Sequence, residues 1–142
     1  MQVIDVGIAV GSARGLVVPI LRDADQMSFA EIEQQIRYFA KSAEDGTLSL
    51  ADLKGGTFTI TNLGAYGVEG FTPIVNPPQS CILGVGSTEQ VPVIRNGQVV
   101  PGSMMSLTLA ADHRAIDGAT GAELLAAIRG FVERPMSLML GI

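Results

Sequence analysis

The first half of the chain predicts a β-hairpin followed by an amphipathic helix. Apolar, β-branched runs at residues 3–10 and 16–21 flank a turn-forming segment at 11–15, the pattern of two antiparallel strands. Ser28 and Glu31 have the spacing of a capping box, so a helix should begin there. Gly46 should end this helix. Its buried face is expected to contain Phe29, Ile32, Ile36, Phe39, Ala40 and Ala43.

The middle of the chain predicts strands. A threonine-rich run at 57–61 and a fully apolar run at 81–85 both have strand composition, and the second should be buried on both faces. Asn96-Gly97 lies between the runs at 91–95 and 98–100, which indicates a tight hairpin.

The C-terminal part predicts one more strand and a second helix. Residues 103–111 have strand composition, and Asp117 can cap a helix that continues until Pro135. The expected buried stripe of that helix is Leu124, Leu125, Ile128, Phe131 and Val132. The resulting order β-β-α-β-β-β-β-β-α predicts one α/β (α+β) domain, a two-layer sandwich of a mixed β-sheet packed with helices.

Composition shows more apolar residues than one small domain needs. The 142 residues are 47% hydrophobic and 16% charged, with a mean hydropathy of +0.37, whereas soluble domains are about 25% charged. No stretch approaches the roughly 18 apolar residues of a membrane span, and residues 1–10 lack a secretory signal pattern. We therefore expect burial against other subunits, with the apolar runs at 16–21 and 81–85 lining a trimer interface and a cleft shared between chains.

Charge and cysteine content argue against two classes of function. The chain has 9 basic and 14 acidic residues, a net charge of −5, and no basic run, so no nucleic acid partner is expected. One cysteine, Cys81, and one histidine, His113, cannot form a Cys/His metal site, so no metal is expected either. The apolar neighbours of Cys81 favour a small buried residue over a nucleophile.

Candidate chemistry gathers where the last strand ends and the last helix begins. The segment reads Asp112-His113-Arg114-Ala115-Ile116-Asp117-Gly118. A histidine at a strand end, near the positive end of a helix, is suited to act as a general base. The residues alone leave a second interpretation open, in which His113 is an ordinary polar residue at a strand end.

This segment resembles the active-site signature of the dihydrolipoamide acyltransferases, the core components of 2-oxo acid dehydrogenase complexes. Its His-x-x-x-Asp-Gly part also occurs in chloramphenicol acetyltransferases and in peptide-synthetase condensation domains. Further segments are similar to the lipoyl acyltransferase pattern and favour that family: GLVVP at 15–19, GTFTITNLG at 56–64, PIVNPP at 73–78 and ILGVG at 82–86.

The resemblance implies acyl transfer between a dihydrolipoyl arm and coenzyme A on a chloramphenicol acetyltransferase-like fold. His113 would be the general base that takes the thiol proton, and Thr61 would donate to the tetrahedral oxyanion. In the family these two groups come from neighbouring subunits of a trimer. Asp117 would order the histidine loop, although a plain N-cap role fits the residues equally well. Asn62 and Arg114 are expected beside the site only.

The resemblance also implies what surrounds the chain. Residues 1–142 look like the C-terminal portion of the catalytic domain, incomplete at its N-terminus and without the lipoyl and peripheral-subunit-binding domains. Coenzyme A would be a substrate, and lipoate would be carried covalently on a domain not present in this chain. The expected partners are a homotrimer that builds a larger core and, through the missing domains, the decarboxylase and dihydrolipoamide dehydrogenase components. The expected compartment is the bacterial cytoplasm or the mitochondrial matrix.

The acyl group and the competence of the chain stay open at this stage. Acetyl is expected, because Asn76-Pro77-Pro78 and Ala111-Asp112-His113-Arg114 are similar to the pyruvate-type variants, yet succinyl and branched-chain members share these motifs. Two alternatives stand beside the acyltransferase. One is a structural fragment of the core that binds no substrate, and the other is a stand-alone chloramphenicol-type acetyltransferase.

Overall fold

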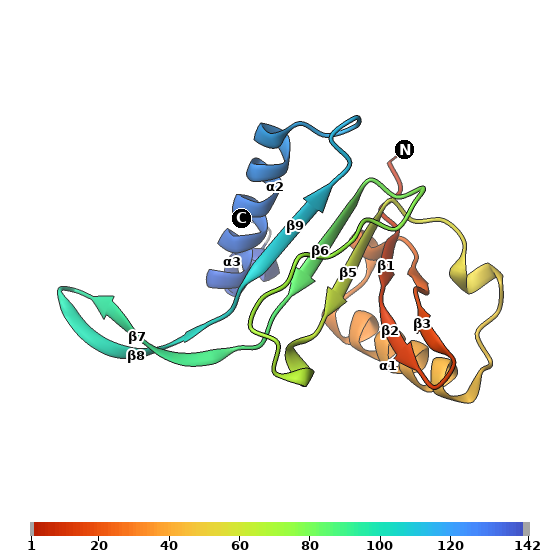
Figure 1. Ribbon diagram of the computed structural model, residues 1–142, viewed down its shortest axis with the longest axis horizontal. Coiled ribbons are helices and arrows are strands. Elements are labelled where there is room, and N and C mark those ends of the chain that lie inside the picture. The colour runs from red at the N-terminus through yellow and green to blue at the C-terminus, as the bar shows by residue number, and fades with distance from the viewer. Residues whose placement is uncertain (1, 141–142) are drawn as a thin grey trace.

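The computed structural model describes residues 2–140 and shows a five-stranded mixed sheet with helices beside it (Figure 1). The strand order is β4 (Ile20–Leu21), β1 (Val6–Ile8), β5 (Phe58–Asn62), β6 (Cys81–Val85) and β9 (Leu107–Ala111). The three inner strands are parallel, and β4 and β9 are antiparallel edges. Helix α1 (Phe29–Asp45) packs against β4 and against β2 (Val10–Ser12), whereas α2 (Gly118–Glu133) packs against β9. The predicted mixed α/β fold is confirmed.

The N-terminal hairpin is present but is divided between two sheets. Strand β2 pairs with β3 (Gly15–Val17) in a separate two-stranded sheet, while β1 pairs with β4 in the main one. The chain changes partner at Ala9, whose N–H donates to the carbonyl of Ile60 at 3.0 Å. Pro19, which has no N–H for a ladder, separates β3 from β4. The prediction of one continuous strand over 3–10 is therefore wrong.

Helix α1 begins and ends where the sequence predicts. The Ser28 hydroxyl accepts from the Glu31 amide at 3.3 Å, and the Glu31 carboxylate accepts from the Ser28 amide at 2.7 Å. The Ser28 hydroxyl also donates to the Glu31 carboxylate at 2.7 Å, and the hydrogen bonds that this carboxylate accepts from the Ser28 amide and hydroxyl lower the pKa of Glu31. The buried face is shorter than predicted: Phe39 and Ala43 are buried, but Phe29 is 54% exposed, because the helix packs mainly on the short strands β2 and β4.

The second hairpin also forms as predicted and projects from the body of the molecule (Figure 1). It joins β7 (Glu89–Arg95) to β8 (Gln98–Met104), with Asn96 and Gly97 at φ 51° and 76° in the turn. The chain then leaves the hairpin for the main sheet, where the carbonyl of Ser106 accepts from the amide of Gly86 at 3.0 Å. This change of partner divides residues 103–111 between β8 and β9, so the prediction of one strand there is wrong.

Strand β6 forms the centre of the core. Cys81, Ile82 and Leu83 are 3%, 6% and 5% exposed, and β5 and β9 pair with the two edges of the strand. The prediction of a buried strand is confirmed for 81–84, while Val85 is half-buried. The single chain already buries 81–84, so the prediction that they line a subunit interface is wrong, but Ile82 does line a cleft. Ile20 and Leu21 are also buried within the chain, so the interface prediction is wrong for them too, whereas Leu16 is 70% exposed and lines the same cleft. Burial raises the pKa of the Cys81 thiol, which fits a structural residue.

The C-terminal helices leave apolar side chains exposed. Pro135 ends α2 as predicted but also starts a short helix, α3 (Pro135–Leu140), that packs against α2. Leu125 and Ile128 are half-buried, whereas the remaining residues of the predicted stripe, Leu124, Phe131 and Val132, are 40%, 42% and 48% exposed. The stripe prediction is wrong for these three because α2 packs mainly against the edge strand β9 and the short helix α3. Within residues 2–140, no helix has the length and apolar character needed to cross a membrane.

Gly86 has the closest backbone neighbour of any glycine in the described part of the chain. A Cβ at this position would lie 1.9 Å from the carbonyl oxygen of Glu69, and the hydrogen bond to Ser106 keeps Gly86 from moving away. Gly86→Ala should therefore lower the free energy of unfolding by about 3 kcal/mol, the upper end of overpacking costs. Chemical denaturation measures this loss. Gly118→Ala is the matched control, since a Cβ there meets nothing within 4 Å, and an equal loss in both variants would contradict the prediction.

Candidate active site

The candidate catalytic residues lie toward opposite ends of the sheet. Thr61 is near the end of β5, while His113 follows the end of β9, which runs the other way (Figure 1). In the strand register Thr61 is opposite Gly84, Gly84 is opposite Thr108, and Ala111 lies three positions further along β9. Thr61 and Ala111 are thus about 10 Å apart along the strands and about 10 Å apart across them. The structure does not bring Thr61 and His113 together within one chain.

His113 is exposed in a turn that its two neighbours hold in place. The Asp112 amide donates to the carbonyl of Ser80 at 2.8 Å, which extends the pairing of β9 with β6 by one residue. Arg114 donates from Nε and Nη2 to the two carboxylate oxygens of Asp112 at 3.0 and 2.8 Å, and from its own amide at 3.0 Å. The hydrogen bonds from the Arg114 side chain and from its amide lower the pKa of Asp112 to about 2. The backbone on both sides of the imidazole is therefore fixed.

Asp117 is the N-cap of α2. Its carboxylate accepts from the Thr120 amide at 2.7 Å, and this hydrogen bond lowers its pKa. The N-cap interpretation is confirmed, and Arg114 pairs with Asp112 instead of Asp117. The side chain of Asn62 also binds the backbone, since its oxygen accepts a hydrogen bond from the Gly64 amide at 2.8 Å. In the described part of the chain, no three His, Cys, Asp or Glu side chains gather to hold a metal.

Thr61 lines a cleft of ≈ 720 Å³ on one face of the sheet. The walls are β3, β5, the segment at 53–55 and the segment at 74–79. The position opposite Thr61 is Gly84, and a Cβ there would lie 3.0 Å from the ring of Phe71 and 3.2 Å from that of Pro73. Glycine thereby lets the connection between β5 and β6 lie close to the sheet. The cleft can admit a substrate to the Thr61 hydroxyl.

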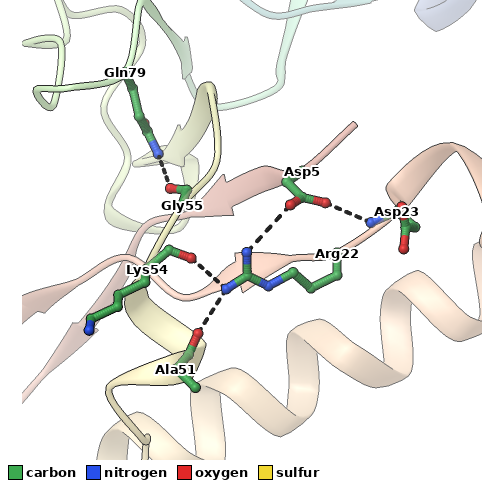
Figure 2. A network of polar contacts seen from close by, with 7 residues as sticks. All are labelled: Asp5, Arg22, Asp23, Ala51, Lys54, Gly55 and Gln79. Atoms are coloured by element: carbon green, nitrogen blue, oxygen red, sulfur yellow. Dashed lines mark hydrogen bonds and ion pairs between the residues drawn. The ribbon is translucent and has the colours of Figure 1, made fainter. Parts of the chain in front are cut away.

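Arg22 fixes one wall of this cleft (Figure 2). Its guanidinium donates to the carbonyl of Ala51 at 2.8 Å and to the carbonyl of Lys54, and it pairs with the Asp5 carboxylate at 3.4 Å. Asp5 is itself held by the Asp23 amide at 2.9 Å. Five residues from three separate segments therefore set the path of the chain through 51–54.

Gln79 holds the same wall from the other side (Figure 2). Its amide nitrogen donates to the carbonyl of Gly55 at 3.5 Å, and its oxygen accepts from the hydroxyl of Thr59, which is 1% exposed. A Cβ at Gly7 would lie 2.7 Å from the Thr59 hydroxyl, so the absence of a side chain at Gly7 makes room for this pair. The sequence analysis did not predict a role for Arg22 or Gln79. The nearest signal in the sequence is the glycine pair Gly55-Gly56, and both glycines adopt a positive φ in the structure.

The Asp112–Arg114 pair has a measurable pH signature. Arg114→Gln should raise the pKa of Asp112 from about 2 toward its ordinary value of 3.8. Because the folded-state pKa is the lower one, the pair stabilises the fold above pH 3.8, and this contribution is lost as the pH falls toward 2. Titration of the aspartate carboxyl carbons by NMR measures the shift. Arg129→Gln, which removes a pair with Glu133 on α2, is the control, and an unchanged Asp112 in Arg114→Gln would disprove the assignment.

Comparison with curated proteins finds acyltransferases over almost the whole chain. The chain is 51% identical over 138 residues to the dihydrolipoyllysine-residue succinyltransferase component of the 2-oxoglutarate dehydrogenase complex of Rickettsia typhi, covering 97% of this chain and 35% of that protein. It is 44% identical over 137 residues to the dihydrolipoyllysine-residue acetyltransferase component of the pyruvate dehydrogenase complex of Rickettsia bellii, covering 96% and 33%. The chain thus spans about a third of the length of these relatives.

Solved structures of acyltransferase cores share the fold. Dihydrolipoamide acetyltransferase of Azotobacter vinelandii, studied for the catalytic role of a serine, a histidine and an asparagine, matches with a TM-score of 0.93 and 33% identity over 98% of this chain and 57% of that one. The cubic core of a pyruvate dehydrogenase multienzyme complex matches with a TM-score of 0.93 and 32% identity, with the same coverage. The fold class expected from the resemblance is confirmed.

The sequence profile of one protein family covers nearly the entire chain. The family is described as 2-oxoacid dehydrogenases acyltransferase (catalytic domain), and the match runs over residues 1–140. It agrees with the relatives of both acyl types and with the structural matches. The chain belongs to the acyltransferase catalytic-domain family of the 2-oxoacid dehydrogenases.

Proposed function

We propose that this chain transfers an acyl group between coenzyme A and a dihydrolipoyl arm, with His113 as general base and Thr61 as oxyanion donor. One observation carries the assignment of residues. In the Azotobacter protein the histidine stands 52 residues after the serine and four residues before the asparagine. Here His113 stands 52 residues after Thr61 and four before Asp117. The same spacing on the same fold supports the same roles, with threonine in place of serine and aspartate in place of asparagine.

His113 is suited to take the proton of an attacking thiol. It is exposed, and the Asp112–Arg114 pair holds its backbone, so the imidazole can reach a substrate from a fixed point. An ordinary thiol has a pKa of about 8.5 and an ordinary imidazole about 6.5, so complete transfer is uphill by about 2.7 kcal/mol. Proton removal would therefore accompany attack of the sulfur on the thioester carbonyl. The sulfur–carbon bond forms as the proton passes to the imidazole, which then returns it to the departing thiol.

Thr61 would stabilise the charge that this attack creates. The tetrahedral intermediate carries an oxyanion, and one well-placed donor is worth about 2.7–4 kcal/mol. The Thr61 side chain lines the cleft, whose walls are held by Arg22 and Gln79. A donor on a fixed strand needs no reorganisation as the charge develops, which is the condition for catalysis of this kind.

The two groups would meet between chains. The strand register keeps Thr61 and His113 apart within one chain, so a site that contains both needs a second copy. Exposed apolar side chains such as Leu16 and Ile74, which are 70% and 87% exposed at the cleft, support burial against such a copy. We infer the trimer that the resemblance implies, with His113 of one chain facing Thr61 of the next. Contacts with the decarboxylase and the dihydrolipoamide dehydrogenase remain part of the same proposal.

Acetyl remains the predicted acyl group, and succinyl is the second candidate. Succinyltransferases of 2-oxoglutarate complexes are among the relatives at 50–53% identity, and two acetyltransferases of pyruvate complexes are 43–44% identical. Two solved structures that match with a TM-score of 0.93 come from acetyltransferase systems. Parallel assays with acetyl-coenzyme A and succinyl-coenzyme A decide between them by the ratio of kcat/KM.

Removal of either proposed group should stop turnover. His113→Ala should abolish acyl transfer to dihydrolipoamide, and Thr61→Ala should lower kcat by about two to three orders of magnitude. Steady-state assays with the acyl-coenzyme A measure both effects. Thr61→Ser keeps the hydroxyl and is the control. Unchanged turnover in His113→Ala would refute the assignment.

Mixing the two inactive variants tests whether the site lies between chains. If His113 and Thr61 come from neighbouring copies in a ring, co-assembly of His113→Ala with Thr61→Ala at equal amounts leaves both groups intact in about a quarter of the sites. Co-expressed chains should therefore regain about a quarter of the native turnover. The separately expressed variants are the control. No regained activity in a mixed assembly of confirmed composition would show that both groups act within one chain.

A further inference from the structure

The cleft that contains Thr61 has one charged side chain on its walls. Among the residues of the described chain that line it, Lys54 is charged, the polar ones are Thr59, Thr61, Asn76 and Gln79, and the others are apolar or glycine. An anionic group that enters this cleft therefore meets a cation with no carboxylate beside it. Lys54 is exposed, so an ion pair with it is expected to be worth no more than an exposed pair.

The Lys54 backbone is held while its ammonium stays available. Arg22 binds the carbonyl of Lys54, and Gln79 binds the carbonyl of the next residue, so the main chain is held on both sides. Figure 2 shows the Lys54 side chain extending away from Arg22. None of the ion pairs formed within residues 2–140 includes Lys54, whereas Lys41 is paired with Asp45 at 3.2 Å.

We propose that Lys54 binds an oxyanion of the acyl-coenzyme A substrate in the cleft beside Thr61. The inference rests on the proposed function, which supplies this substrate. An acyl-coenzyme A carries two kinds of oxyanion: the phosphates of the coenzyme A part, and the terminal carboxylate that a succinyl group has and an acetyl group lacks. Both match an ammonium group, which contacts oxyanions as a point charge.

Kinetics of Lys54→Gln separate the two sources of the oxyanion. The variant is compared with Lys41→Gln, the substitution of the only other lysine, using acetyl-coenzyme A, succinyl-coenzyme A and acetyl-3′-dephospho-coenzyme A. We expect Lys54→Gln to raise KM about two- to fivefold with kcat little changed, the range of an exposed ion pair. A rise for succinyl-coenzyme A alone identifies the carboxylate. A rise for both acyl-coenzyme A thioesters that is lost without the 3′-phosphate identifies that phosphate, and an equal rise for all three identifies the pyrophosphate. Unchanged KM values for all three substrates would overturn the inference.

A binding measurement separates this inference from the proposed function. Reductive dimethylation with ¹³C-formaldehyde keeps the charge of both lysines and gives each an NMR signal, which Lys54→Gln and Lys41→Gln assign. Titration of the full chain with succinyl-coenzyme A should shift the Lys54 signal and leave that of Lys41 in place, and coenzyme A should also shift it if the oxyanion is a phosphate. If both ligands bind and acyl transfer occurs while the Lys54 signal does not move, the inference is wrong and the proposed function stands. If the native chain neither binds these ligands nor transfers an acyl group, the proposed function is wrong, and this inference, which depends on it, is wrong as well.

Discussion

The hydrogen-bonded register of β6 determines where everything else in the main sheet lies. One edge of β6 pairs in parallel with β5 and the other pairs antiparallel with β9, so the ends of β5 and β9 point in opposite directions. A parallel pair also needs a connection that crosses the sheet. Here that connection carries Phe71 and Pro73 over Gly84 and continues as a wall of the cleft. The same ladder thus builds the cleft around Thr61 and keeps His113 away from it.

This arrangement accounts for the apolar excess of the composition. The buried hydrophobic residues of residues 2–140 centre on β4, β6 and α1, while large apolar side chains stay exposed at the cleft, along the β7–β8 hairpin and on the C-terminal helices. Ile74, Ile94 and Met139 are 87%, 68% and 64% exposed. The excess therefore lies on the surface of the single chain and not in its core. A surface of this kind is typical of a chain whose faces are covered in an assembly.

Local chemistry explains which parts of the fold were predictable. The capping box at Ser28 and Glu31, the Asn96-Gly97 turn and the Asp117 N-cap each need only a few neighbouring residues, and all three form as predicted. The errors occur where the chain changes partner, at Ala9 and before Ser106, because a strand has the same composition whichever strand it pairs with. Burial of α2 was overestimated for a related reason, since periodicity shows which face is apolar but not whether anything covers it.

The candidate site also has one part that could be predicted from the sequence and one part that could not. The turn around His113 is a short contiguous motif, and its Asp112–Arg114 pair is visible in sequence as two opposite charges on either side of the histidine. The wall held by Arg22 and Gln79 joins residues far apart in the chain, and nothing local marks those partners.

The Asp112–Arg114 pair around His113 has a thermodynamic consequence for ligand binding. Fixing the backbone of one residue costs roughly 1–2 kcal/mol of conformational entropy at 25 °C. Because Asp112 and Arg114 flank the imidazole and are tied to each other, that ordering takes place when the chain folds. An arriving molecule then has to restrict only the two side-chain torsions of the histidine. The turn is thus preorganised, and more of the interaction energy is left for the reacting atoms.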